Sequence, residues 1–204
     1  MFELPKSTQI KKPIHKTMIY AKFTEELSGE KKEIFDSDIS RIVLMNEISP
    51  VSVNIKEGEK VSSLFVVRIE LKNKEYHERN IILIAKLFMQ NLLFVLHYEN
   101  EYQMAIYETQ LLKSEWKREE EFELKLTGLD LDSVWDDLVV QVSGIHIEDG
   151  NTLVEQIGLE NEKEKMRKRI EQIAKKLKKE TQSKKKFELF QEMKKWENKL
   201  EELE

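Results

Sequence analysis

The chain has 204 residues, with 39 Asp and Glu against 34 Lys and Arg, and a net charge of −5. It contains no cysteine, which excludes disulfide bonds and thiolate metal sites. The N-terminus lacks the apolar core of a signal peptide, and the longest apolar region, residues 81–96, is interrupted by polar residues and is too short to cross a bilayer. We therefore expect a soluble, cytoplasmic protein with one compact domain and an appendage.

The first quarter of the chain holds all three prolines, Pro5, Pro13 and Pro50. Because proline fixes φ and has no backbone N–H, the opening residues predict an extended arm that drapes over the domain and ends near Ile14. Short helices are expected next, at residues 16–27 and at residues 30–35.

Strands are predicted at residues 39–48, 51–55 and 64–72. The last is the clearest, because every second residue from Phe65 to Leu71 is apolar and lies on one face. The other face holds Val66, Arg68, Glu70 and Lys72.

A largely buried helix is expected at residues 76–89, followed by a β-hairpin of residues 92–98 and 102–109 and a short strand at 122–126. Asp130 and Asp132 then mark the start of another helix, where carboxylates favour the helix dipole. Strands and helices interleave without a regular βαβ repeat. This order predicts an α+β domain, residues 1–150, with a mixed sheet and flanking helices.

The last part of the chain, residues 151–204, predicts two charged amphipathic helices. Each carries an apolar seam at alternating steps of three and four residues, the pattern of a coiled coil. The first seam consists of Met166, Ile170, Ile173 and Leu177, and the second seam consists of Leu189, Met193, Trp196, Leu200 and Leu203.

The two seams are offset by two residues, so one straight helix could not bury both against one partner. An antiparallel hairpin folded at residues 181–184 could do so. Charge supports this arrangement. Residues 163–186 hold twelve Lys and Arg against three Glu, a net charge of +9, whereas residues 187–204 hold three Lys against six Glu, a net charge of −3. Residues 1–162 carry a net charge of −11.

A run of lysines at the expected hairpin tip is a candidate contact for a nucleic-acid backbone. No aromatic residue is interleaved for base stacking, so such binding is expected to be independent of sequence. The alternative is a solvated helix face. The lysines are Lys175, Lys176, Lys178, Lys179, Lys184, Lys185 and Lys186.

Glu70 and Lys72, two apart on the clearest strand, suggest a different function. Divalent-metal-dependent nucleases of the restriction-endonuclease type place a Glu and a Lys at this spacing, the carboxylate on Mg²⁺ and the ammonium beside the attacking water. The expected order, helix–strand–strand–strand–helix–strand, resembles the core of that fold. Those enzymes also need an Asp on the preceding strand, where this chain has only Glu57 and Glu59 in the following turn.

Other patterns point to no cofactor and no metal. The four histidines, His15, His77, His97 and His146, are scattered without metal-ligand spacing. The acidic set around Asp130 lacks the glycine and final glutamate of a Ca²⁺ loop, so we interpret it as helix capping. There is no phosphate-binding glycine-rich loop and no nucleophile elbow.

Three segments resemble the bacterial domain-of-unknown-function family 4391, although Ala85 and Met89 stand where that family more often has an acidic residue and a proline. The resemblance implies a protein encoded beside helicases and DNA methyltransferases of restriction-modification or phage-defence clusters, and it implies no activity. The segments are residues 1–16, the central block 65–96, and the tail 179–189.

We therefore expect a non-enzymatic accessory subunit that docks through its hairpin onto a helicase-type or methyltransferase-type protein, or onto a second copy of itself. Trp196 and Met193 are the expected anchors, because Trp and Met are enriched in interface cores. The alternative is a divalent-metal-dependent nuclease, active or degenerate, that uses Glu70, Lys72 and Mg²⁺.

Overall fold

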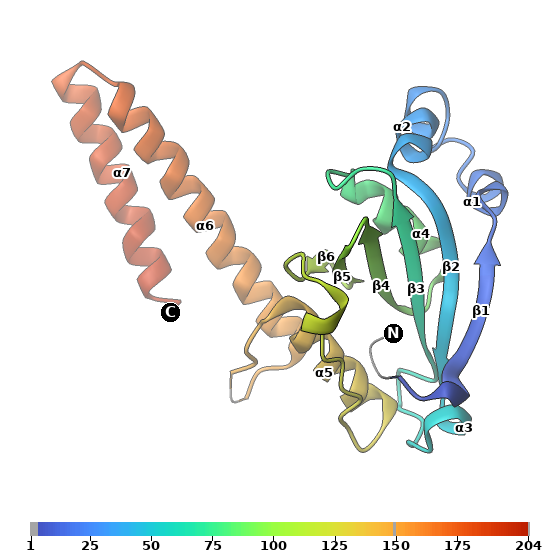
Figure 1. The fold of residues 1–204 in the computed structure, drawn as a ribbon. Helices are drawn as coiled ribbons and strands as arrows, with labels where there is room; N and C mark the ends of the chain where they lie inside the picture. Colours follow the sequence, from blue (N-terminus) through green and yellow to red (C-terminus); the bar gives the residue numbers. More distant parts are fainter. Residues whose placement is uncertain (1–3, 149, 204) are drawn as a thin grey trace. The chain divides into compact units, whose positions relative to one another are not determined.

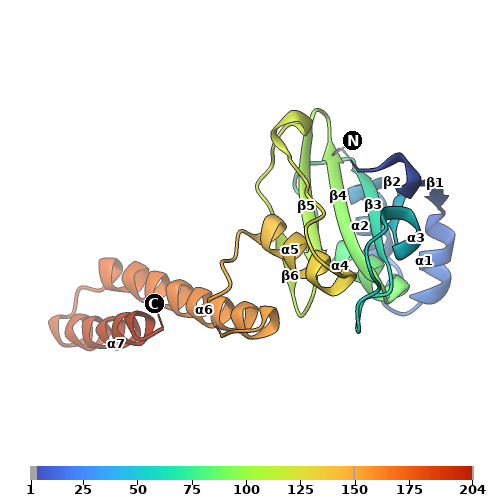
Figure 2. The ribbon, with the colours of Figure 1, turned by 90° about the horizontal axis from the view of Figure 1, so that it is seen from below.

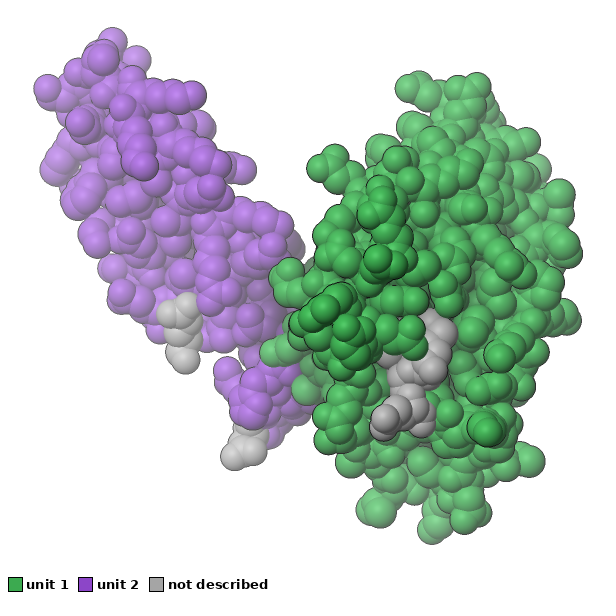
Figure 3. All heavy atoms as spheres, in the orientation of Figure 1, with its two compact units in different colours: residues 1–144 green, residues 145–204 purple. Residues whose placement is uncertain are grey.

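A computed structural model describes residues 4–148 and 150–203. The chain forms two compact units, residues 1–144 and residues 145–204 (Figure 3). The first unit, here called the body, contains a sheet and its helices. The second unit contains a pair of long helices. None of the described helices combines the length and apolarity that a bilayer crossing requires.

The body is built on a six-stranded mixed sheet whose strands follow one another in space as they do in sequence. Figure 1 shows the first four side by side. Every neighbouring pair is antiparallel except β3 and β4, which are parallel. The strands are β1 (Gln9–Ile14), β2 (Ile39–Ile48), β3 (Leu64–Leu71), β4 (Asn91–Tyr98), β5 (Glu101–Tyr107) and β6 (Leu111–Lys113).

The parallel pair requires a crossover, and a helix supplies it: α4 connects β3 to β4. Together with α1 and α2 it packs against one face of the sheet, where Phe35, Ile69, Ile84 and Phe94 are fully buried. A further helix, α5, packs against β5 and β6. The helices of the body are α1 (Lys16–Lys22), α2 (Glu30–Asp38), α3 (Pro50–Val53), α4 (Glu78–Phe88) and α5 (Leu131–Ser143). A mixed sheet with flanking helices confirms the α+β prediction.

Strand β3 shows the predicted alternation. Val67, Ile69 and Leu71 are buried in the core formed with α1, α2 and α4, whereas Arg68 and Glu70 are only partly buried. The predicted alternation therefore holds for residues 67–71, whereas Val66, on the predicted polar face, is buried, and Phe65, on the predicted apolar face, is only partly buried.

Two predicted strands were wrong. Residues 51–55 are not a strand, because Pro50 occupies the first turn of α3 and Ser49 and Ser52 form its capping box. Residues 122–126 form no strand. The N-terminal arm is extended and lies against the body as far as Ile14, as predicted, and its residues 9–14 pair with β2 as an edge strand that the sequence did not predict.

Strand β1 is irregular. Its register against β2 shifts between Gln9 and Lys12, and Lys11 within the shift has a positive φ of 55°. This geometry is that of a β-bulge, which leaves an extra residue on one strand. Five of the six residues of β1 are exposed.

The second unit contains α6 (Leu153–Lys179) and α7 (Ser183–Glu201), packed together and joined by residues 180–182 (Figure 1, Figure 2). Thr152 and Glu155 form a capping box at the start of α6. The chain reverses at the predicted place, so the helical hairpin is confirmed.

Candidate functional site

The apolar seams of α6 and α7 are only partly buried. Ile173 is the one seam residue that is buried, with 1% of its surface exposed. The other members are partly buried: Met166, Ile170, Leu177, Leu189, Met193, Trp196, Leu200 and Leu203. Helices α6 and α7 pack together, and eight of the nine seam residues keep part of their surface accessible.

Helix α7 is the less covered of the two. None of its 19 residues, all of which the structure describes, is buried. Phe187 and Phe190 are exposed to 61% and 43%. These two aromatics were not among the predicted anchors, because they lie off the second seam. Their spacing of three residues, which places both on one side of a helix, was the signal that could have found them.

An ion pair joins the two helices near their middle. Arg169 Nη2 of α6 lies 2.7 Å from Glu192 Oε1 of α7. Its partners are about 40% exposed, so the pair contributes little stability and chiefly fixes the register of the hairpin.

A groove of about 550 Å³ lies between α6 and α7 near the tip of the hairpin. Both signs of charge line it, so the groove has no strong preference for an anion or a cation. Its lining consists of Lys176, Lys179, Glu180, Lys185, Glu188, Leu189 and Glu192.

The seven lysines near the tip are all exposed. Lys175 pairs with Glu171 at 2.7 Å. In the part of the chain that the structure describes, the other six make no ion pair; we call them the tip lysines. They are Lys176, Lys178, Lys179, Lys184, Lys185 and Lys186.

The Glu180 carboxylate, which lies in the turn between α6 and α7, accepts hydrogen bonds from the turn itself. Glu180 Oε1 accepts hydrogen bonds from the backbone N–H groups of Gln182 and Thr181 at 2.8 and 2.9 Å. The Gln182 N–H is the largest cause that lowers the pKa of this carboxyl, and Lys185 lowers it further. Glu180 therefore stays ionised and holds the turn.

In the body, Glu70 does not stand alone on its strand face. Arg68 Nε lies 2.6 Å from Glu70 Oε1, and His97 Nδ1 contacts Glu70 Oε2. Glu70 and His97 are register partners in the parallel pair β3–β4, which brings residues 27 positions apart together. The carboxylate is thus held between two cationic or hydrogen-bonding groups.

Tyr102 of β5 completes this cluster. Its ring centroid lies 4.5 Å from that of His97, and the Arg68 guanidinium carbon lies 5.7 Å from the same ring. Burial raises the pKa of the Tyr102 hydroxyl, Arg68 opposes that shift, and Glu119 adds to it through its charge and a hydrogen bond. We interpret the cluster as an internally paired network that ties β3, β4 and β5 together.

The residues proposed for a nuclease site do not converge. Lys72 follows the end of β3, exposed, with its backbone N–H donating to Asp38 O at 2.8 Å. Glu57 and Glu59 precede β3, and six strand residues separate its start from Glu70, roughly 20 Å at 3.3 Å per residue. Among residues 4–148 and 150–203, no group of three His, Asp or Glu side chains could hold a metal ion.

The aspartates around α5 have structural roles. Asp130 caps the helix by accepting from the Ser133 N–H at 2.8 Å. Asp132 instead accepts from the backbone N–H groups of Glu59, Lys60 and Val61 at 2.8–3.3 Å. It thereby fastens the loop before β3 to the start of α5.

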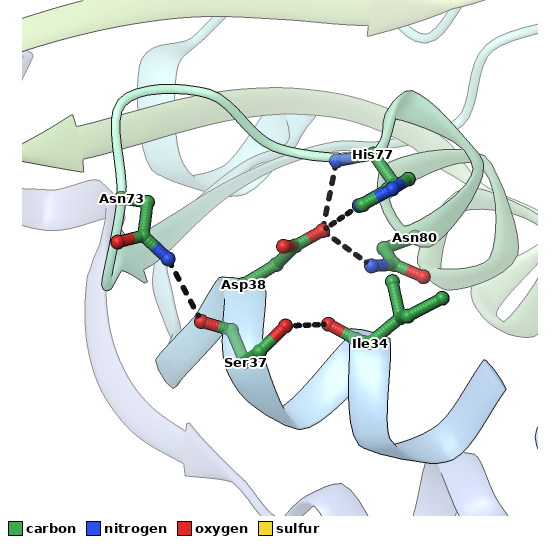
Figure 4. A network of polar contacts seen from close by, with 6 residues as sticks. All are labelled: Ile34, Ser37, Asp38, Asn73, His77 and Asn80. Atoms are coloured by element: carbon green, nitrogen blue, oxygen red, sulfur yellow. Dashed lines mark hydrogen bonds and ion pairs between the residues drawn. The ribbon is translucent and has the colours of Figure 1, made fainter. Parts of the chain in front are cut away.

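Asp38 is a buried carboxylate that the sequence did not single out (Figure 4). Its Oδ2 accepts from the His77 N–H and the Asn80 amide, each at 2.8 Å, and from His77 Nδ1 at 3.0 Å. Since His77 precedes the first residue of α4, this carboxylate of α2 caps α4 from a distance. It joins two helices that pack on the same face of the sheet.

Comparisons with known proteins agree with the resemblance noted in the sequence. No curated protein and no solved structure matches the chain. One family model, described as Domain of unknown function (DUF4391), matches residues 2–200. This match includes the body and nearly the whole hairpin. The chain therefore belongs to the DUF4391 family.

Proposed function

We propose that the chain is a non-enzymatic interaction subunit that docks onto a larger protein through the hairpin of α6 and α7. The observation that carries this proposal is the state of α7, whose apolar row of Leu189, Met193, Trp196 and Leu200 has no buried member. A helix of 19 residues draws most of its stability from packing of its apolar face. A partner that covers this row would therefore stabilise both the complex and the helix.

The composition of the row fits a protein partner. Trp and Met are enriched in the cores of protein interfaces, and truncation of a central Trp often costs 2 kcal/mol or more of binding free energy, a loss of about 30-fold in affinity. Phe187 and Phe190 extend the exposed apolar surface of the helix. The partner that we propose is a DNA-processing protein, such as a helicase or methyltransferase of a restriction or phage-defence system, as the family resemblance implies.

Co-purification from a native host, with the full chain as bait, tests the proposal. We expect one stoichiometric partner, and we expect Trp196→Ala with Met193→Ala to lower its affinity about 30-fold or more. Met89→Ala in the body is the matched control, because Met89 is 85% exposed and lies outside the hairpin. A monomer that captures nothing, or equal capture by the two variants, would contradict docking through α7.

The nuclease alternative is less well supported, because Glu70 is paired with Arg68 and His97, and among the described residues no group of three His, Asp or Glu side chains could hold a metal ion. Incubation of the chain with DNA or RNA and Mg²⁺ or Mn²⁺ distinguishes the two functions. We expect the wild-type chain and a Glu70→Ala variant to give the same result. Cleavage by the wild type that the variant loses would favour the nuclease.

A further inference from the structure

We infer that the tip of the hairpin contacts the phosphate backbone of a nucleic acid, without reading base sequence. This inference is independent of the docking proposed above, because it concerns the end of the hairpin rather than the apolar row of α7. It rests on three features of the tip. The tip lysines make no ion pair among the described residues, three of them lie at the positive end of the α7 helix dipole, and the Glu180 carboxylate is hydrogen-bonded within the turn.

The positive charge at the tip is concentrated, and only three of the tip lysines, Lys176, Lys179 and Lys185, share the groove with carboxylates. The tip lysines lie in the last four residues of α6 and the first four of α7. At 1.5 Å rise per residue, they therefore lie within roughly 5 Å of helix length from the turn. None is in an ion pair among the described residues, whereas Lys168, Lys175 and Lys194 of the same hairpin are paired at 2.7 Å.

The lysines at the start of α7 destabilise the helix. Cations repel the positive end of the helix dipole, and the first turn holds Lys184, Lys185 and Lys186 with no acidic residue. The N-cap residue, Gln182, makes no side-chain capping hydrogen bond. If these lysines only faced solvent, nothing would offset their repulsion by the helix dipole. Phosphates bound at this end of the helix would offset it.

The chemistry of the tip fits phosphate more closely than other anionic surfaces. All its cations are lysines, which bind phosphate oxygens as point charges and do not impose the planar geometry of an arginine pair. Binding flat on a lipid surface needs an apolar helix face, and the first turn of α7 exposes three lysines before Phe187. Duplex DNA presents one charge per 1.7 Å of its axis, so several lysines at one tip can meet phosphates together.

Binding of a fluorescent 20-mer, single- or double-stranded, by the full chain at two salt concentrations tests the inference. Four phosphate contacts predict a loss of about a hundred-fold in affinity between 50 and 200 mM salt. The chain as a whole has a net charge of −5, which opposes binding of an oligonucleotide. Binding would therefore have to come from a local positive patch. Oligonucleotides of unrelated sequence should bind alike.

The test variant is Lys184→Glu with Lys186→Glu, because neither residue lines the groove of mixed charge. Its matched control is Lys12→Glu with Lys22→Glu in the body, which are exposed and make no ion pair among the described residues. Both variants bring the net charge from −5 to −9. We expect the tip variant to bind at least tenfold more weakly at 50 mM salt and the control to bind as the wild type.

Thermal unfolding separates loss of contact from loss of fold. Glutamates in the first turn suit the dipole, so the tip variant should unfold at the same or a higher temperature than the wild type. The neutral variant Lys184→Gln with Lys186→Gln should lower the slope of log affinity against log salt by about two. No binding at 50 mM, equal loss in the control, or binding to anionic phospholipid vesicles but not to oligonucleotides would overturn the inference.

Discussion

Replacement of Asp38 by alanine is expected to lower the free energy of unfolding of the body by about 3 kcal/mol. The side chain is only 5% exposed, and Oδ2 accepts three hydrogen bonds from His77 and Asn80. Removal of the carboxylate leaves the buried Asn80 amide and the first N–H of the α4 region without an acceptor. Urea unfolding of the full chain measures the change.

Asp38→Asn is the matched control for this effect. It keeps the shape of the side chain and one carbonyl oxygen, so it should cost less than the alanine variant, although it brings an amide toward donors rather than acceptors. If the free energy of unfolding of Asp38→Ala lies within 1 kcal/mol of that of the wild type, the network in Figure 4 does not hold α2 and α4 together.

Ile173→Asp is expected to destroy the hairpin while the body stays folded. Ile173 is the one buried seam residue, and a carboxylate at this position loses the apolar contacts and gains an unpaired charge, together about 4 kcal/mol. Two helices that pack mainly on each other cannot withstand that loss. Circular dichroism should lose most of the helical signal of α6 and α7, and resistance of the body to proteolysis should persist.

Gln172→Asp controls for the new charge, because Gln172 is exposed and adjacent to Ile173. It should leave the helical signal nearly unchanged. A helical signal that survives Ile173→Asp would show that the seam is not what holds the hairpin together.

Much of the fold could be predicted from local patterns. The alternation of β3 and the seams of α6 and α7 are periodic, and a period identifies the buried face whatever packs against it. Residues 51–55 alternate as well, yet Ser49 and Pro50 start a helix there, so local capping prevailed over the pattern. Strand β1 was missed because Pro13 and two lysines hide an edge strand.

The polar sites depended on contacts that no local pattern encodes. Glu70 was found on its strand face, but its partner His97 follows from the register of two parallel strands. Asp38 and Asp132 serve elements far along the chain, at residues 77–80 and 59–61. The tip lysines were identified as a charge run, whereas the structure was needed to show that they make no ion pair among the described residues.

The irregularity of β1 also restricts how copies of the body can associate. An unpaired sheet edge invites the strand of another chain, and aggregation often begins there. One edge strand, β1, has a shifted register and contains Lys11, Lys12 and Pro13. The other edge strand, β6, has only three residues. Such short or bulged edges oppose strand addition, so the sheets of two bodies should not pair with each other at high concentration. Any assembly of this chain is then expected to use helices rather than a shared sheet.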